Sequence, residues 1–332
     1  MLRQIARAVV PRSARLAVSH LLSNRESDRA RDELEAMGRR TGPVIVGPWI
    51  GEVGFELLYW IPFLQWAVRA GRIDRARIVV VSRGGPASWY RHIADRYADV
   101  FDFLTPEEFQ SRNRERHGEV GEQKQVRSTS LEEDLVGRVS KANGLQSPDV
   151  LHPGLMYRVM NPYWWGHRQA DWIERHAEFR TLQAGTTADI ELPDDYTAVK
   201  FYFNECFPAT AENRAAATRL VRTLADEGAV VSLATGLRLD DHHAWDEEEG
   251  VALAGIRSAV TPATNLAFQT TVVAGAKAWA GTYGGFAYLA PFHGVPARAL
   301  YSDAAGFSRR HLDLAQRVFA RFGPDLLQLA HA

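Results

Sequence analysis

Two glutamates near the start of the chain have the setting of a catalytic base. They lie in the segment Gly51-Glu52-Val53-Gly54-Phe55-Glu56, directly after an apolar stretch. A carboxylate in such a loop can take the proton of an attacking hydroxyl group. We expect Glu52 to be this base, because glycine-containing sequence flanks it at the end of a strand. Glu56 is the second candidate, but it begins a helix and would also suit the helix dipole as a first-turn acid. The remaining alternative is that both carboxylates are solvated loop residues.

A glycine pair in the second half of the chain has the setting of a phosphate site. In Thr282-Tyr283-Gly284-Gly285-Phe286, a strand-like stretch meets two glycines and then a helix. Glycine lets backbone N–H groups approach a phosphate closely, and a helix N-terminus adds partial positive charge. The segment therefore predicts a diphosphate site that needs no metal, although tight strand-to-helix turns also use glycine for steric reasons.

Polar residues at the ends of other expected strands fit the same ligand. Lys200, within the apolar stretch YTAVKFYF, or Arg214 would offset the charge of a diphosphate, unless Lys200 pairs with a structural acid. Asn204 would line the cleft. Thr235-Gly236 would lie at the nucleobase or ribose, and Asp240 would hold a ribose hydroxyl.

The segment 151–180 is unusually aromatic. Aromatic faces with polar neighbours bind sugars well, so we expect an acceptor site formed by this segment and the first glycine loop; its candidate residues are Gly51, Gly54, His152, Tyr163, Trp164 and Arg168. An aromatic helix anchored in the core is an equally good interpretation.

The sequence predicts neither a metal site nor a bound cofactor. His242 and His243 stand beside several aspartates, but adjacent histidines on a loop rarely face one ion, and no HxxxH or CxxC spacing occurs. No Gly-x-Ser-x-Gly elbow, Walker loop or complete Gly-x-Gly-x-x-Gly is present. The absence of these motifs argues against a hydrolase, a P-loop ATPase and an ordinary NAD dehydrogenase.

The elements that must position these residues alternate between strand and helix. Expected strands cover 44–46, 76–82, 100–104, 196–203, 230–234, 276–281 and 297–301, and expected helices cover 57–70, 89–97, 210–228, 265–275 and 308–322. This alternation predicts an α/β fold of two Rossmann-like domains with parallel sheets, whose ligand crevices face one cleft.

The expected division of the chain follows from the same pattern. A basic helical segment (1–40) precedes an acceptor domain (41–188) with a helical and aromatic insertion at 110–180. A nucleotide-sugar domain (189–307) and a terminal helix (308–332) that returns to the first domain complete the chain. The charged stretch 110–143 is expected to be solvated helix or mobile loop.

Composition excludes several classes of protein. With 332 residues, 46% hydrophobic and 24% charged, the chain suits two globular domains, and a net charge of −1 gives no field that favours nucleic acid. Cys206 is the single cysteine, expected to be a buried thiol in a cytoplasmic protein. We expect no transmembrane helix, because glycine, proline or polar residues interrupt every long apolar stretch.

The first 20 residues contain Arg3, Arg7, Arg12 and Arg15, several apolar residues and no acid. This pattern suits peripheral contact with anionic lipid at the inner face of a membrane. The alternative is a helix packed on the body of the protein, or a frayed terminus.

Two stretches resemble a known family. NLAFQTTVVAGAKAWAGTYGGFAYLAPFHGVPARALY (265–301) resembles the donor-binding half of GT-B glycosyltransferases, especially lipopolysaccharide heptosyltransferases, and VIVGPWIGEVGFELLYWIPFL (44–64) resembles their first domain. GT-B fucosyltransferases are a looser match. The resemblance implies that Glu52 corresponds to the acidic base. It departs at Tyr283, where heptosyltransferases usually place Asp, so it does not extend to ADP-heptose as the donor.

The combined interpretation is an inverting, metal-independent glycosyltransferase. It would move a sugar from a nucleoside-diphosphate sugar to a glycan or glycolipid acceptor. The alternatives are a sugar-nucleotide epimerase, a polysaccharide pyruvyl transferase of similar fold, and a non-catalytic sugar-nucleotide binding protein.

Overall fold

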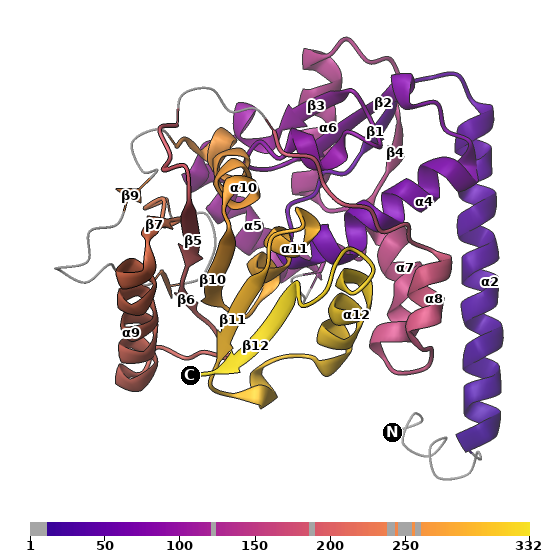
Figure 1. Cartoon of the computed structure of the whole chain (residues 1–332). Coiled ribbons are helices and arrows are strands. Elements are labelled where there is room, and N and C mark those ends of the chain that lie inside the picture. Colours follow the sequence, from indigo (N-terminus) through magenta and orange to yellow (C-terminus); the bar gives the residue numbers. More distant parts are fainter. Residues whose placement is uncertain (1–11, 121–123, 186–189, 238–242, 245–253, 256–259) are drawn as a thin grey trace.

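The computed structural model describes residues 12–120, 124–185, 190–237, 243–244, 254–255 and 260–332 (Figure 1). Asp240 and His242, named above for a ribose and for a metal, lie outside the described residues.

The first sheet contains four parallel strands in the order β3-β2-β1-β4. These strands are β1 (Val44–Val46), β2 (Ile78–Ser82), β3 (Arg96–Asp99) and β4 (Asp149–Leu151). Side chains alternate between the two faces of a strand. Val44 and Val46 therefore join the core under the helices α4 (Ile61–Gly71) and α7 (Pro153–Trp164), whereas Ile45 packs with Leu135 and Val139 of α6 (Ser130–Ala142) on the other face. Helices on both faces explain why every residue of β1 and β2 is buried.

The second sheet contains six parallel strands in the order β12-β11-β10-β5-β7-β9. They are β5 (Tyr196–Lys200), β7 (Ala229–Ser232), β9 (Ala254–Gly255), β10 (Ala278–Thr282), β11 (Ala297–Tyr301) and β12 (Leu327–His331). Numbered along the chain, they stand in the order 3-2-1-4-5-6 of the Rossmann fold, and the first sheet repeats its 3-2-1-4 part. The prediction of two Rossmann-like units is confirmed.

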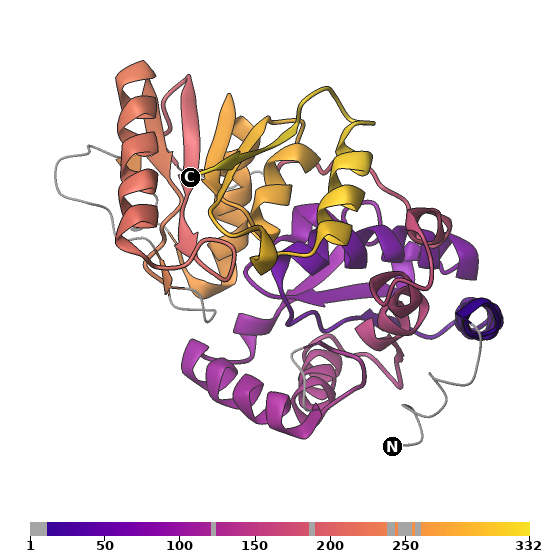
Figure 2. The ribbon, with the colours of Figure 1, turned by 90° about the horizontal axis from the view of Figure 1, so that it is seen from below.

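In each sheet the strand order reverses between the first and fourth strands, which are β1 and β4 in one sheet and β5 and β10 in the other. Open α/β sheets bind their ligands at the carboxyl ends of the strands beside this reversal. Figure 2 separates the two units, with the purple first unit on one side and the orange and yellow second unit on the other.

Helices cover these sheets and join the units. The helices of the first unit are α2 (Arg12–Arg39), α3 (Val53–Phe55), α4 (Ile61–Gly71), α5 (Pro106–Val120), α6 (Ser130–Ala142), α7 (Pro153–Trp164) and α8 (Ala170–Arg175). Those of the second are α9 (Ala211–Glu227), α10 (Asn265–Gly275), α11 (Leu289–Phe292) and α12 (Arg309–Phe319), and a two-stranded antiparallel pair joins β6 (Tyr202–Phe203) to β8 (His243–Ala244). Thr210 caps α9 as expected, by accepting a hydrogen bond from the Asn213 N–H.

Several local predictions were wrong. The third strand lies at Arg96–Asp99, and residues 100–102 form a 3₁₀ turn where a strand was expected. No helix covers 89–97, because a short 3₁₀ turn ends at Tyr90. The predicted helix 57–70 is confirmed, although its first part is a π turn, Glu56–Trp60, that leads into α4 (Ile61–Gly71). The last residues form the strand β12 rather than more helix.

The chain after Ser308 contacts both units. Helix α12 lies against the first unit, where the Arg310 carbonyl accepts a hydrogen bond from the Tyr163 hydroxyl and the His311 Nδ1 lies 2.5 Å from the Tyr59 hydroxyl. β12 then pairs with β11 in the second sheet. Within the described residues, no helix is long and apolar enough to cross a bilayer.

Candidate functional site

The two glycine segments meet. A Cβ atom built on Gly54 would lie 2.3 Å from the Gly285 Cα, and one built on Gly285 would lie 2.5 Å from the Gly54 Cα. Such distances are far inside van der Waals contact, so only glycine lets the two backbones approach this closely. The structure thus brings the predicted base loop of one unit against the predicted phosphate turn of the other.

Glu52 is exposed and stands in extended conformation immediately before α3. Its carbonyl accepts a hydrogen bond from the Glu56 N–H at 3.0 Å, which starts the helical segment. The loop begins at the carboxyl end of β1, where the strand order of the first sheet reverses. Glu52 therefore has the position and the solvent access that a general base requires.

Two side chains from distant segments hold this loop. Arg83, at the carboxyl end of β2, donates to the Gly51 carbonyl at 2.8 Å. Gln125 accepts from the Ile50 N–H at 3.0 Å and donates to the Pro48 carbonyl at 2.8 Å. The backbone just before Glu52 is therefore fixed by hydrogen bonds on both sides.

Gln125 belongs to a buried network that the sequence analysis did not find. It also donates to the Glu132 carboxylate at 2.6 Å, and the Thr129 hydroxyl donates to the same carboxylate. His152 caps α7, and its Nε2 lies 3.1 Å from Glu132. These hydrogen bonds, His152 first, lower the pKa of Glu132 against the opposing effect of burial. The stretch 110–143 was expected to be solvated or mobile, but this part of it is a buried support for the loop, and His152 is turned toward that support.

Glu56 is completely buried. Its Oε1 accepts hydrogen bonds from the Ser82 hydroxyl at 2.5 Å and from the Tyr90 hydroxyl, and its Oε2 has no partner. Burial raises the pKa of Glu56 to about 7, although these bonds and the nearby Arg83 act in the opposite direction. Glu56 therefore fits a neutral core group better than a base that meets substrate.

Lys200 lies at the carboxyl end of β5, beside the reversal of the second sheet. Its Nζ donates to Gln269 on α10 and stands 4.2 Å from the centre of the Phe286 ring. Gln269 is fixed in turn by donation to the Asn265 side chain at 2.8 Å. Lys200 thus contacts the Gln269 amide and the Phe286 ring directly beside the glycine turn.

The other residues of the glycine turn are tied to the chain that follows β5. Thr282 donates to the Tyr202 carbonyl at 2.7 Å, and Asn204 donates to the Tyr283 carbonyl at 3.0 Å. A Cβ on Gly284 would collide with the Tyr202 hydroxyl. Tyr283 is buried, which raises its pKa to about 12, and its hydroxyl lies 3.0 Å from that of Tyr288. Asn204 and Tyr283 therefore hold the glycine turn in place through hydrogen bonds and buried contacts.

Cys206 is buried beneath the same turn, and burial raises the pKa of its thiol to about 11, as the prediction of a structural thiol requires.

Of the aromatic and basic residues predicted to bind the acceptor, only Trp164 lies near the loop of Glu52, whereas Tyr163 and Arg168 contact other elements. Trp164 packs near the base loop, because its ring stands 5.5 Å from Phe55 and Lys124 lies 5.4 Å above it. Tyr163 is buried against α12. Arg168 is directed away, since it donates to the His20 carbonyl and the Asn24 side chain of α2. Arg168 therefore anchors α2 in this structure and is not brought to the base loop.

Thr235 and Gly236 follow β7 on the same edge of the second sheet, where Thr235 is half-buried and Gly236 is exposed. In the described parts of the chain, no three His, Cys, Asp or Glu side chains gather in a way that would hold a metal ion.

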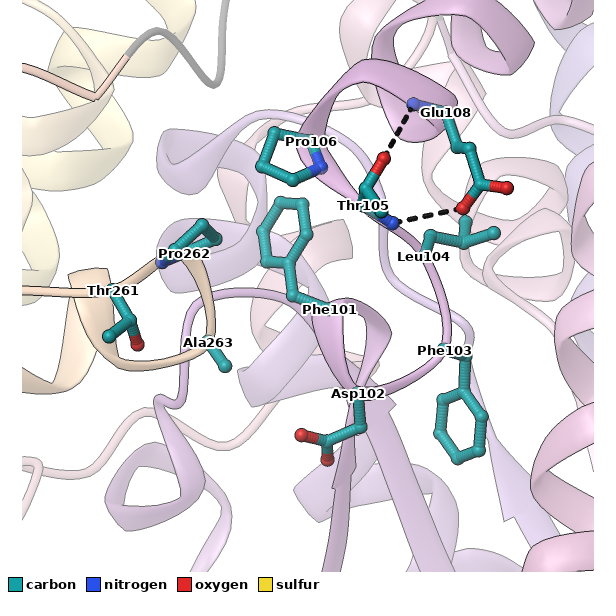
Figure 3. Close-up of a pocket in the computed structure, with 10 residues that line it drawn as sticks. All are labelled: Phe101, Asp102, Phe103, Leu104, Thr105, Pro106, Glu108, Thr261, Pro262 and Ala263. Carbon is teal, nitrogen blue, oxygen red and sulfur yellow. Dashed lines mark hydrogen bonds between the residues drawn. The ribbon is translucent and has the colours of Figure 1, made fainter.

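Two cavities open elsewhere. One of about 490 Å³ lies between the units, where residues 101–106 and Glu108 of the first face Thr261, Pro262 and Ala263 of the second (Figure 3). Another of about 540 Å³ lies around Arg91 and Gln183. Neither is lined by Glu52, Lys200 or Gly285.

Comparison with known proteins adds solved structures only, since no family model and no curated protein matches the sequence. The glycosyl transferase family 9 protein of Veillonella parvula is 10% identical over 89% of this chain and 87% of that chain, with a TM-score of 0.43. The Escherichia coli ADP-heptose lipopolysaccharide heptosyltransferase II is 15% identical over 87% and 90%, with a TM-score of 0.45. An E. coli heptosyltransferase determined with ADP-2-deoxy-2-fluoro heptose is 15% identical over 87% and 93%, with a TM-score of 0.38.

Proposed function

We propose that this protein is a glycosyltransferase that moves a sugar from a nucleoside diphosphate to a glycan or glycolipid acceptor, with inversion and without a metal ion. The observation that carries the proposal is the contact between two loops, each of which follows a strand at the point where the strand order of its sheet reverses. One loop bears an exposed carboxylate, and the other is a glycine turn with a lysine beside it.

The donor would bind the second unit. Lys200 offers a cation near Phe286, and the Gly284-Gly285 turn has no side chains of its own to block an approaching diphosphate. Positive charge and backbone N–H groups would stabilise the diphosphate as it leaves with added negative charge. Because Gly54 touches Gly285, entry of the donor requires the two units to separate at this contact.

The acceptor would bind the first unit. Glu52 would take the proton of the acceptor hydroxyl as that oxygen attacks the anomeric carbon and the bond to the diphosphate breaks. The half-buried rings of Phe55 and Trp164, with Lys124 above them, lie next to this loop and would contact the acceptor. Arg83 and Gln125 would keep Glu52 in place through the backbone.

Nucleotide binding tests the donor half of the proposal. Calorimetric titration with UDP, GDP, ADP, CMP and dTDP, each with and without magnesium, should give binding of one nucleoside diphosphate that does not need magnesium. Lys200→Met should weaken that binding about 10- to 100-fold, because it removes one charge-assisted contact.

Lys277→Met is the matched control. Lys277 stands just before the amino end of β10, at the edge of the sheet opposite to the one where Lys200 ends β5. It pairs with Asp195 on the surface. Its loss should leave the affinity unchanged. The donor site would be misplaced if both variants weakened binding equally, and the proposal would fail if no nucleotide bound. A donor-only assay that yields an epimerised sugar nucleotide would favour the epimerase instead.

A further inference from the structure

Helix α2 has an apolar stripe on the side that faces solvent. Val18, Leu21 and Leu22 are 55%, 63% and 55% exposed. Their spacing of three and four residues puts them on one face of the helix. The opposite face, which includes Ser23, Ser27 and Ala30, is buried against the body of the first unit. The stripe is therefore not the part of α2 that holds the helix in place.

Trp165 adds an exposed apolar side chain on a second element that is fixed to α2. Its side chain is 70% exposed, in the turn between α7 and α8. This turn is fixed to α2, since His167 lies within hydrogen-bond distance of Ser19 and His20. Among the described residues, the exposed large apolar side chains are these four and Val150. Four of the five thus lie on α2 or on the turn that is fixed to it, and we name these four residues the α2 patch (Val18, Leu21, Leu22 and Trp165).

Exposed arginines follow the α2 patch along the helix, although Arg29 also pairs with Glu26 at 2.7 Å and the exposed Asp28 stands beside it. Before Glu26 the chain contains five arginines, Arg3, Arg7, Arg12, Arg15 and Arg25, and no acidic residue. Arg25 and Arg29 continue the exposed face of α2 one and two turns beyond Leu22, and both are exposed. An apolar stripe bordered by arginine, with an exposed tryptophan beside it, fits the boundary between lipid headgroups and acyl chains.

The position of α2 leaves the patch accessible. The helix lies at one edge of the molecule, on the far side of the first unit from the second sheet (Figures 1 and 2). Contact of the patch with a flat surface would not cover the loop of Glu52 or the glycine turn.

We propose that the α2 patch docks the protein on an anionic phospholipid surface. The apolar side chains enter the interface, and the arginines pair with lipid phosphates. Docking of this kind does not depend on the proposed transferase activity, but it would bring a lipid-linked acceptor to the protein.

Vesicle co-sedimentation tests the proposal. The purified full chain should bind vesicles of phosphatidylcholine and phosphatidylglycerol, bind pure phosphatidylcholine far less, and lose binding in high salt, because exposed charges are screened there. The triple variant Leu21→Ser, Leu22→Ser, Trp165→Ser should reduce the partition coefficient at least about tenfold. Arg25→Gln with Arg29→Gln should reduce binding to the anionic vesicles alone.

Val150→Ser is the control, since Val150 is also exposed, at 37%, but lies on β4 outside the patch. It should bind as the original protein does, and all variants should keep the same thermal midpoint because the altered side chains are on the surface. Absence of vesicle binding by the original chain, or equal binding by the triple variant, would overturn the proposal. So would a dimer that dissociates in the triple variant without any vesicle binding, since the patch would then join two copies.

Discussion

Glu56 shows how burial separates two carboxylates that are four residues apart in the sequence. Both lie in one short motif, yet Glu52 is exposed and Glu56 is fully buried beneath Ser82 and Tyr90. Their spacing in the sequence could not distinguish them, because the hydroxyl groups that donate hydrogen bonds to Glu56 come from β2 and the turn after it. The prediction of Glu52 as the base stays untested, and the burial of Glu56 leaves Glu52 as the stronger candidate.

The raised pKa of Glu56 predicts a pH-dependent stability. The folded protein keeps the Glu56 proton up to about pH 7, whereas the unfolded chain loses it near the ordinary glutamate pKa of 4.5. The stability that this group contributes is thus complete below pH 4.5 and is lost as the pH rises to about 7. Glu56→Gln should therefore gain about 3 kcal/mol relative to the original chain between pH 4.5 and 8.

Urea unfolding at several pH values measures this difference. Asp99, whose pKa burial raises to about 6, titrates in the same range but is present in both proteins, so its contribution largely cancels. A difference in free energy that stays constant with pH would show that Glu56 is ionised when folded.

At the scale of elements, the sequence predicted the strands and helices with strong periodicity. The strands at 44–46 and 297–301 and the helix at 265–275 have the predicted bounds. It missed β4, because three residues that begin with Asp149 carry no apolar run. It also missed Gln125 and Glu132, since a charged stretch does not reveal which of its polar side chains will be buried. The glycines in the sequence were enough to predict where the candidate site lies. The sequence did not predict the buried hydrogen bonds of Gln125 and Glu132 that hold its loop.

The contact between α3 and the glycine turn predicts a sharp effect of one methyl group. Gly54→Ala would put a Cβ into the Gly285 backbone, which cannot move as a side chain would. We expect a loss of about 1–3 kcal/mol in the free energy of unfolding. Gly137→Ala is the control, because Gly137 lies in α6 with no atom within 4 Å of an added Cβ, and it should be neutral or slightly stabilising. Equal midpoints for Gly54→Ala and the original chain would mean that the two backbones do not meet this closely.

At the scale of the whole molecule, the first sheet repeats part of the strand order of the second. The loops that follow β1 and β10, beside the reversals of strand order, touch at Gly54 and Gly285. The alternation of strands and helices was sufficient to predict two such units. Their relative position depends on contacts that no local pattern encodes, such as the bond between the Tyr163 hydroxyl and the Arg310 carbonyl. Helix α12 thereby joins the units before β12 completes the second sheet.

The measurement that tests the central claim most directly is turnover by Glu52→Gln with the sugar nucleotide whose diphosphate binds. Release of the nucleoside diphosphate in the presence of acceptor should fall about 10²- to 10⁴-fold, while calorimetry gives an unchanged affinity for the nucleotide. Glu212→Gln, which alters an exposed acid at the start of α9, should keep full turnover. Full turnover by Glu52→Gln would contradict the account, because the carboxylate at the meeting of the two units would then play no part in the reaction.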